Sequence, residues 1–150
     1  MKALIQRVSE ASVRVEGQVV GSIGPGLLVL AGFRAEDDQS QLDWMARKVT
    51  GLRIFPDQSG DMNVSVLDHG GSLLAVSQFT LHANCRKGRR PSYMAAAPPD
   101  QAQVLYRLFL QTLRGYGLPV ESGVFGAMME ISLVNDGPVT IMVDSPSERA

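Results

Sequence analysis

The strongest structural signal in the sequence is an apolar run, Leu27-Leu28-Val29-Leu30-Ala31-Gly32-Phe33. An unbroken run of this length is typical of a central strand that is covered on both faces. A Gly-Pro-Gly break at residues 24–26 precedes it. Before the break, apolar and polar residues alternate on either side of a turn at 16–18, which predicts a hairpin. The aliphatic segment at 3–8 predicts a further strand.

Two longer segments have helical periodicity. Residues 37–52 place their apolar side chains on one helical face, and Asp38 or Ser40 could cap the first turn. Residues 98–114 carry a second apolar stripe, and the glycines at 115 and 117 end it. Shorter elements complete the pattern: strands at 53–55, 62–67, 72–81, 131–134 and 139–143, a long connection at 82–97, and a frayed end at 145–150.

The fold expected from this pattern is an α/β protein of the α+β type. Its sheet should be mainly antiparallel and barrel-like, with two principal helices. We expect one domain over residues 1–150, because no repeat, linker or low-complexity segment divides the chain.

The composition excludes several classes of protein. Hydrophobic residues make up 45% of the 150 residues and charged residues 19%, which argues against a disordered chain or a coiled coil. A net charge of −1 excludes a uniformly basic nucleic-acid coat, but not a local basic patch. The longest strictly apolar run is 27–31, far short of the roughly 18 residues that a membrane span needs. With no signal-peptide pattern either, we expect a cytoplasmic protein, and the low charge suggests a surface covered by a partner.

The lone thiol and the histidines give no convincing catalytic or metal site. Cys85 and His82 lie three residues apart in the sequence, but nothing evident orients the imidazole as a base for the thiol. His69, His82 and Cys85 are too few for an ordinary zinc site. We therefore expect no metal and no cofactor.

A polar segment, Ser77-Gln78-Phe79-Thr80, ends the predicted strand at 72–81. Such residues are common at the surface end of any strand. Hydroxyl and amide groups at a strand end can also orient a polar substrate, and free backbone N–H groups there can stabilise an oxyanion.

Four cations follow within five positions: Arg86, Lys87, Arg89 and Arg90. They could form an ordinary solvated loop. Alternatively they contact phosphates, because guanidinium groups match phosphate oxygens in pairs. One local patch suits a nucleic-acid end better than a long duplex.

The segment Asp136-Gly137-Pro138 lies between two predicted strands and has turn chemistry, so we interpret it as a hairpin tip. Taken by itself, a Gly-Pro bond is expected to be trans, since about 5% of such bonds in folded proteins are cis.

Two motifs together indicate a family. Ser77-Gln78-Phe79-Thr80-Leu81 and Asn135-Asp136-Gly137-Pro138-Val139-Thr140 resemble the paired signatures of D-aminoacyl-tRNA deacylases, the D-tyrosyl-tRNA deacylase family. The resemblance runs nearly end to end, and includes residues 3–8, 26–30 and 90–92. Tyr93 departs from it, because phenylalanine is expected there, and residues 144–150 extend past the usual end.

The resemblance implies a homodimer with two active sites at the interface and a substrate made of a D-amino acid esterified to the terminal ribose of tRNA. The family's Gly-Pro bond is cis, so Gly137 and Pro138 would read chirality from the second subunit, with Arg7 packed against them. Glycine mischarged on tRNA(Ala) should also be accepted. Phe79 would contribute a backbone N–H, with Ser77 and Gln78 beside it.

Thr80 would act as a nucleophile or would position a water molecule or the ribose hydroxyl. We favour positioning, because no histidine or carboxylate is evidently placed to activate it. The competing hypotheses are a non-catalytic protein that binds tRNA ends and a subunit that serves assembly alone.

Overall fold

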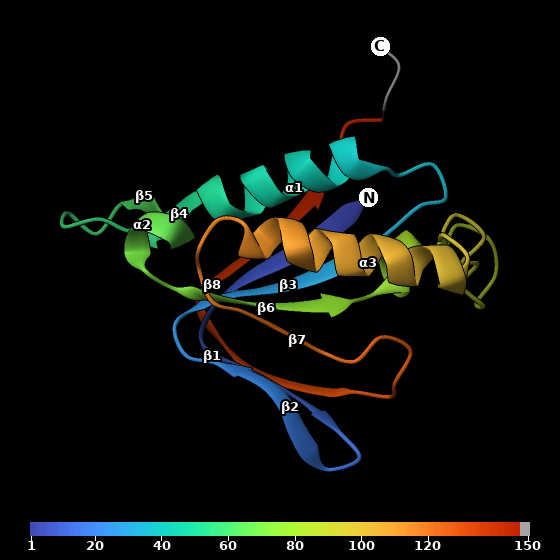
Figure 1. Cartoon of the computed structure of the whole chain (residues 1–150), viewed down its shortest axis with the longest axis horizontal. Helices are drawn as coiled ribbons and strands as arrows, with labels where there is room; N and C mark the ends of the chain where they lie inside the picture. Colours follow the sequence, from blue (N-terminus) through green and yellow to red (C-terminus); the bar gives the residue numbers. More distant parts are fainter. Residues whose placement is uncertain (148–150) are drawn as a thin grey trace.

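The computed structural model describes residues 1–147, which form a mixed α+β structure around one curved sheet (Figure 1). The main sheet has the strand order β2-β1-β3-β6-β7, and β8 pairs with the free edge of β1. Its strands are β1 (Lys2–Val15), β2 (Gln18–Ile23), β3 (Gly26–Gly32), β6 (Ser72–Ser77), β7 (Val120–Ser122) and β8 (Glu130–Asp144). The other elements are β4 (Arg53–Pro56), β5 (Met62–Ser65), α1 (Gln39–Gly51), α2 (Val66–His69), α3 (Pro99–Arg114) and the 3-10 helix η1 (Phe79–His82).

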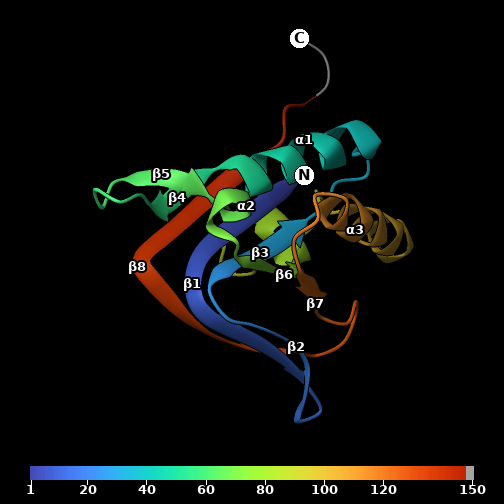
Figure 2. The same cartoon turned by 60° about the vertical axis from the view of Figure 1, so that its left-hand side comes forward.

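Strand β1 organises the sheet because it has partners along both edges. On one edge, its residues 2–8 pair with β3 and its residues 11–15 pair with β2, both antiparallel. On the other edge, β8 runs antiparallel along almost the whole of β1. Figure 2 shows β1 and β8 bending together, so that the sheet wraps into a nearly closed, barrel-like form.

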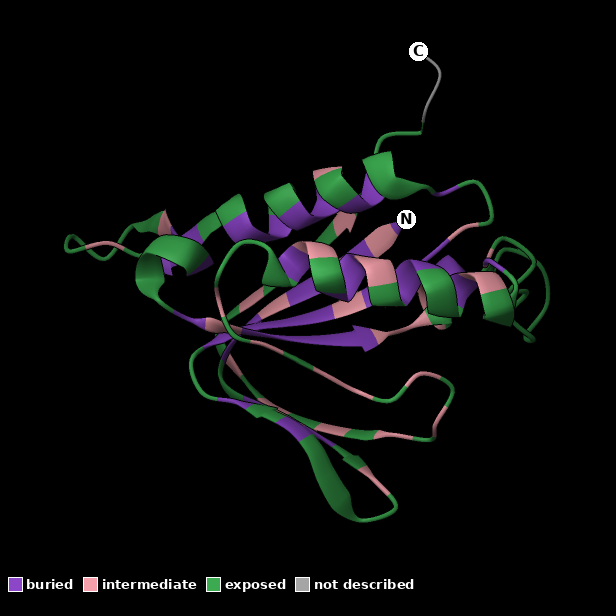
Figure 3. Cartoon of the chain, viewed as in Figure 1, coloured by how far each residue is buried: buried purple, intermediate pink, exposed green. Residues whose placement is uncertain are grey.

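The two long helices cover one face of the upper part of the sheet (Figure 1). Their buried stripes face the strands and their exposed sides face away (Figure 3). Asp38 caps α1, with its carboxylate accepting from the backbone N–H of Ser40 at 2.7 Å and Gln41 completing a capping box. The core between helices and sheet includes Ile5, Leu27 and Phe109, all fully buried.

Strand β3 is covered on both faces, as its apolar run predicts. Leu27 and Val29 belong to the cluster under the helices, whereas Leu28 belongs to a second cluster with Val13 and Leu74 on the opposite face. The expected α+β class, with two principal helices and a barrel-like sheet, is confirmed.

Several local expectations are wrong. Residues 131–134 and 139–143 are not the arms of a hairpin, because both belong to the single strand β8 and pair with β1. Strand β6 ends at Ser77 rather than at 81, and residues 62–67 divide between β5 and α2. The strand β7 was not expected at all. The main sheet is mainly antiparallel, as expected, and its parallel pairs are β3–β6 and β6–β7.

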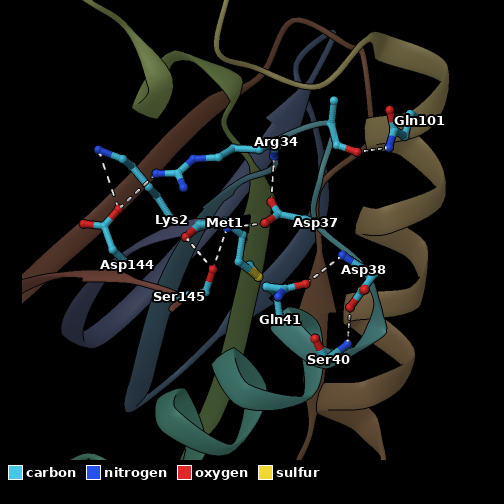
Figure 4. A network of polar contacts seen from close by, with 11 residues as sticks. Met1, Lys2, Arg34, Asp37, Asp38, Ser40, Gln41, Gln101, Asp144 and Ser145 are labelled. Carbon is cyan, nitrogen blue, oxygen red and sulfur yellow. Dashed lines mark hydrogen bonds and ion pairs between the residues drawn. The ribbon is translucent and has the colours of Figure 1, made fainter. Parts of the chain in front are cut away.

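The two ends of the described chain are held together by buried polar contacts (Figure 4). The Met1 amine donates to Asp37 Oδ1 and to Ser145 Oγ, each at 2.6 Å. Asp37 also accepts from the backbone N–H of Arg34 at 2.6 Å. Ser145 is buried, so the expected fraying does not begin there. The rest of that expectation reaches residues 148–150, which lie outside the described residues.

Candidate active site

The polar segment at 77–80 occupies the carboxyl end of β6, where the chain turns into η1. Ser77 is the last residue to pair with β3, opposite Ala31, and the backbone N–H of Gln78 donates to the carbonyl of Ala31 at 2.7 Å. The chain then leaves the sheet through the single 3-10 turn Phe79–His82. Gln78, Phe79 and Thr80 are therefore presented at the end of a buried strand rather than within it.

The side chains of Gln78 and Thr80 bond to each other, with Gln78 Nε2 donating to Thr80 Oγ1 at 2.5 Å. Within residues 1–147, no histidine or carboxylate forms a hydrogen bond with this hydroxyl. The hydroxyl thus accepts from an amide and has no adjacent base, so its proton can be donated to a ligand. This arrangement suits a positioning group better than an activated nucleophile.

Phe79 forms part of the wall of a cavity of about 730 Å³. Its ring is half exposed and forms a T-shaped pair with the ring of Tyr93, with ring centroids 5.2 Å apart. Ser77 and Gln78 also line the cavity, together with residues 125–129 of the β7–β8 connection. A mostly apolar cavity of this volume, with a few polar groups, is typical of a small-ligand site.

Two methionines that line this cavity are unusually exposed. Met94 and Met128 line it and are 92% and 91% exposed. No motif in the sequence singles out these residues or the 125–129 connection. Their signal in the sequence is weak, because methionine is usually a core residue and the walls meet only when the sheet curls.

His82 is the last residue of η1 and packs against β3. Its side chain is buried beside Gly32, and a Cβ on Gly32 would lie 3.3 Å from His82 Nε2. Burial lowers the pKa of His82, and the nearby cations Arg34, Lys2 and the Met1 amine lower it further, whereas a hydrogen bond with the Gly32 backbone acts in the opposite sense. Among the described residues, Nε2 has no hydrogen-bond partner. The imidazole is therefore held neutral and supports η1 structurally.

Gly137 and Pro138 lie in a bulge of β8. Gln6 pairs with Thr140 and Val8 pairs with Asn135, so residues 136–139 all face Arg7. The Gly137–Pro138 peptide bond is cis, and Gly137 has a φ of 123°. An ideal Cβ on Gly137 would lie 3.0 Å from Arg7 Nη2 and 3.1 Å from the backbone nitrogen of Val139. Both the backbone conformation and the crowding therefore favour glycine here.

Arg7 holds the start of this bulge. The largely buried guanidinium donates from Nη1 to the Ile54 carbonyl at 2.7 Å and from Nε to the Asp136 carbonyl at 3.2 Å. Nε also lies 3.3 Å from the Asp136 carboxylate. Arg7 thus links the bulge to β4, a contact that local sequence patterns cannot show.

The structure does not bring the two motifs together within one chain. Ser77, Gln78 and Phe79 line the cavity, whereas Arg7, Gly137 and Pro138 do not. Residues 136–138 are exposed. The bulge therefore lies exposed at the surface of its own chain, away from the cavity.

The basic loop lies beyond η1. Arg86, Lys87, Arg89 and Arg90 are all exposed, and across residues 1–147 none of the four forms an ion pair. A backbone bridge between Asn84 and Ser92 closes the loop. Cys85 is exposed and free. In the described part of the chain, no three potential metal-ligating side chains cluster, and no helix has the length and hydropathy to cross a membrane.

Fold and site together define a class: an α+β protein whose curled sheet carries an apolar cavity beside a Ser-Gln-Phe-Thr strand end. The family described as D-Tyr-tRNA(Tyr) deacylase matches residues 4–144. The chain belongs to this family, so the resemblance recognised from its motifs is confirmed.

Individual members of the family are similar to this chain over nearly its whole length. A D-aminoacyl-tRNA deacylase of Thermomicrobium roseum is 59% identical over 149 residues, 99% of this chain and 97% of that protein. One of Brevibacillus brevis is 56% identical over 97% of this chain and 100% of its own length.

Two solved structures have the same fold. The c-Myc DNA unwinding element binding protein has a TM-score of 0.92 and 44% identity, covering 98% of this chain and 100% of its own. A probable eukaryotic D-amino acid tRNA deacylase has a TM-score of 0.82 over 95% of this chain and 97% of its own. At 19% identity it supports the fold alone.

We expect acid to destabilise the fold through His82. Its pKa in the folded state lies below the ordinary 6.5, so the unfolded chain binds the proton more readily. The free energy of unfolding should therefore fall as pH drops below about 6.5, by at most about 1.4 kcal/mol per pH unit. Urea unfolding of wild type and His82→Leu at pH 7 and pH 5 measures this, and the variant should lose part of the acid sensitivity. His69→Gln, at the exposed histidine, is the control and should keep it; equal slopes in wild type and His82→Leu would contradict the assignment.

Proposed function

We propose that the chain hydrolyses the ester bond of D-aminoacyl-tRNA at the strand end 77–80 and releases free D-amino acid and tRNA. Family membership and relatives at 53–59% identity over nearly the whole chain make it an enzyme, a D-aminoacyl-tRNA deacylase. The observation that carries the site assignment is that the first signature motif, at Ser77–Phe79, borders a cavity of about 730 Å³.

The cavity suits the terminal nucleoside of tRNA. Its volume lies within the range of sites for small organic ligands. Phe79 and Tyr93 place aromatic rings at its wall, and bases stack on such rings at about 1–3 kcal/mol each. A nucleoside held there would carry its aminoacyl ester beside Gln78 and Thr80.

The proposed chemistry needs modest acceleration because the ester is already activated. Water adds to the carbonyl carbon, the bond to the ribose oxygen breaks, and that oxygen leaves with a proton. The backbone N–H of Phe79 would stabilise the oxyanion, and the Thr80 proton would orient the attacking water or the ribose. The vicinal ribose hydroxyl would assist the attack. No cofactor enters these steps.

Thr80→Ala should therefore retain activity, with kcat/KM reduced by no more than about tenfold, roughly the value of one hydrogen bond. A substrate whose terminal ribose lacks the vicinal hydroxyl should lose about 100-fold or more. Single-turnover deacylation of both substrates by both proteins measures this. An acyl group trapped on Thr80 would show covalent catalysis instead.

We propose further that Gly137 and Pro138 read chirality from the second subunit of a homodimer. The support is their exposure and their separation from the cavity of their own chain. Facing the ester of the other subunit, their carbonyls would accept from the substrate amino group and leave no room for an L side chain. Glycine has no side chain to exclude, so glycyl-tRNA mischarged on tRNA(Ala) should pass.

A two-fold dimer is therefore expected in solution. Light scattering of active enzyme should give about twice the 16.2 kDa mass of one chain. A monomer mass at full activity would rule out the shared site.

Gly137→Ala should strongly reduce cleavage of D-tyrosyl-tRNA, because the added Cβ meets Arg7 and Val139 and the positive φ disfavours alanine. The strain is about 1–3 kcal/mol, which the fold should survive. Arg7→Ala should lower the ratio of kcat/KM for D- over L-tyrosyl-tRNA. Thermal unfolding supplies the control for folding, and wild-type behaviour of Gly137→Ala would place the chiral wall elsewhere.

We also propose that Arg86, Lys87, Arg89 and Arg90 bind tRNA phosphates. They are exposed and free of ion pairs in the described chain, so their charge is available. Replacing two of them by alanine should raise KM more than it lowers kcat. The slope of log kcat/KM against log salt at low substrate should flatten by about 1.4, the value for two single-strand phosphate contacts.

The matched control for this experiment is the double variant Arg47→Ala/Arg107→Ala, whose arginines are exposed on α1 and α3. It should keep the wild-type slope. An unchanged slope in the loop variant would mean that the loop is merely solvated.

The second candidate is a protein that binds tRNA ends without cleaving them. The hydroxyl of Thr80 lacks an adjacent base, which favours this reading. A solved relative is also described as a DNA unwinding element binding protein. Incubation with D-tyrosyl-tRNA separates the two candidates, because an enzyme cleaves the ester and a binder protects it.

A further inference from the structure

The bulge at 136–139 interrupts the ladder between β1 and β8, so something other than ladder bonds must hold it. Bulged residues leave the strand pairing, and bulges are common where a strand re-aims its side chains. Arg7 bonds Asp136, the first residue of the bulge. The far end of the bulge, at Val139 and Thr140, is held by a different set of side chains.

Asn135 spans the neck of the bulge. Its Oδ1 accepts from the backbone N–H of Val139 at 3.3 Å, and its Nδ2 donates to Thr140 Oγ1 at 2.9 Å. The amide orientation follows from the first bond, because a backbone N–H can only donate and must face the amide oxygen. The side chain therefore ties the residue before the bulge to the residues that end it.

Gln6 holds the same hydroxyl from the neighbouring strand. It is the ladder partner of Thr140, and its Nε2 donates to Thr140 Oγ1 at 3.2 Å. The two amides together occupy both lone pairs of that oxygen. The Thr140 hydroxyl is thus an acceptor shared by β1 and by the neck of the bulge.

We propose that Gln6 and Asn135 form a clasp on Thr140 that sets the position of Gly137–Pro138, and that Gln6 is a positioning residue for chiral selection. The inference rests on the proposed function, because selection by this bulge is part of it. Arg7 fixes one end of the bulge and the clasp fixes the other. Releasing the clasp should let the wall yield to an L side chain while the reacting groups near Thr80 stay in place.

The test measures kcat/KM for D- and L-tyrosyl-tRNA in Gln6→Leu, Thr140→Val and the double variant. Gln6→Leu should lower the D/L ratio about threefold to tenfold, mainly by raising cleavage of the L substrate, as loss of an ordinary hydrogen bond would allow. Because Gln6 acts through the hydroxyl, it should have no further effect in the Thr140→Val background. Thr140→Ser keeps the hydroxyl and should keep the wild-type ratio.

Gln18→Leu is the matched control, since Gln18 is an exposed strand residue on β2 away from the bulge. It should leave both rates unchanged. Gln6 is only partly buried, so Gln6→Leu should unfold within about 2 °C of wild type, and the test does not depend on Thr140→Val folding.

The outcomes distinguish a failure of the clasp from a failure of the proposed function. If wild type discriminates but folded Gln6→Leu keeps the wild-type D/L ratio, the clasp is overturned and the deacylase function stands. Additive effects of Gln6→Leu and Thr140→Val on that ratio would overturn the clasp in the same way. Wild type that does not cleave D-tyrosyl-tRNA would overturn the proposed function and the clasp with it.

Discussion

The architecture depends on the double pairing of β1. A strand has two hydrogen-bonding edges, and β1 gives one of them to β8 and shares the other between β3 and β2. The change of partner falls between Val8 and Ala11, where the register with β8 also shifts. Because the upper half of β1 supports the helices and the lower half continues into the β2 hairpin, the curl of the whole sheet follows from this strand.

The same constraint places the two motifs apart. The bulge at 136–139 faces Arg7, just before β1 changes partner, and Arg7 reaches on to the Ile54 carbonyl of β4. The Ser77–Thr80 segment ends β6, which is separated from β1 by β3. One subunit therefore carries a polar strand end beside a cavity and, on another part of its sheet, an exposed glycine–proline bulge. This separation is the reason that a shared site between two subunits is the natural proposal.

The charged groups inside the fold differ from those of the 86–90 loop in being paired or neutral. The net charge is only −1, yet four cations stand together in the 86–90 loop without ion-pair partners in the described chain. Charges inside the fold are instead paired or neutral: the Met1 amine meets Asp37, Arg7 meets carbonyls, and His82 is kept uncharged by burial. Unpaired positive charge is thus most concentrated in the surface loop that follows η1, where four cations fall within five positions.

Local chemistry in the sequence was enough to predict the main elements and the family. The run 27–33 predicts a strand buried on both faces because apolar residues must be covered. Asp38 and Ser40 predict the start of α1 because either side chain can accept from free N–H groups of the first turn, and the structure shows that Asp38 is the cap. The residues of both motifs were likewise recognisable by type and spacing. Each of these signals is contained in a stretch of a few residues, so it can be recognised before the fold is known.

What only the tertiary structure decided concerns partners distant in the chain. A hairpin and a bulged strand share the same alternation and the same Asn-Asp-Gly-Pro chemistry, and the difference is whether 131–134 pairs with 139–143 or both pair with β1. The cavity joins residues near 33, 77–79, 93–99 and 125–131, and Arg7 finds the carbonyl of Ile54. Such contacts depend on how β1 bends and which edge each strand takes. Hydrogen bonding between strands is non-local, so no short stretch of sequence contains that information.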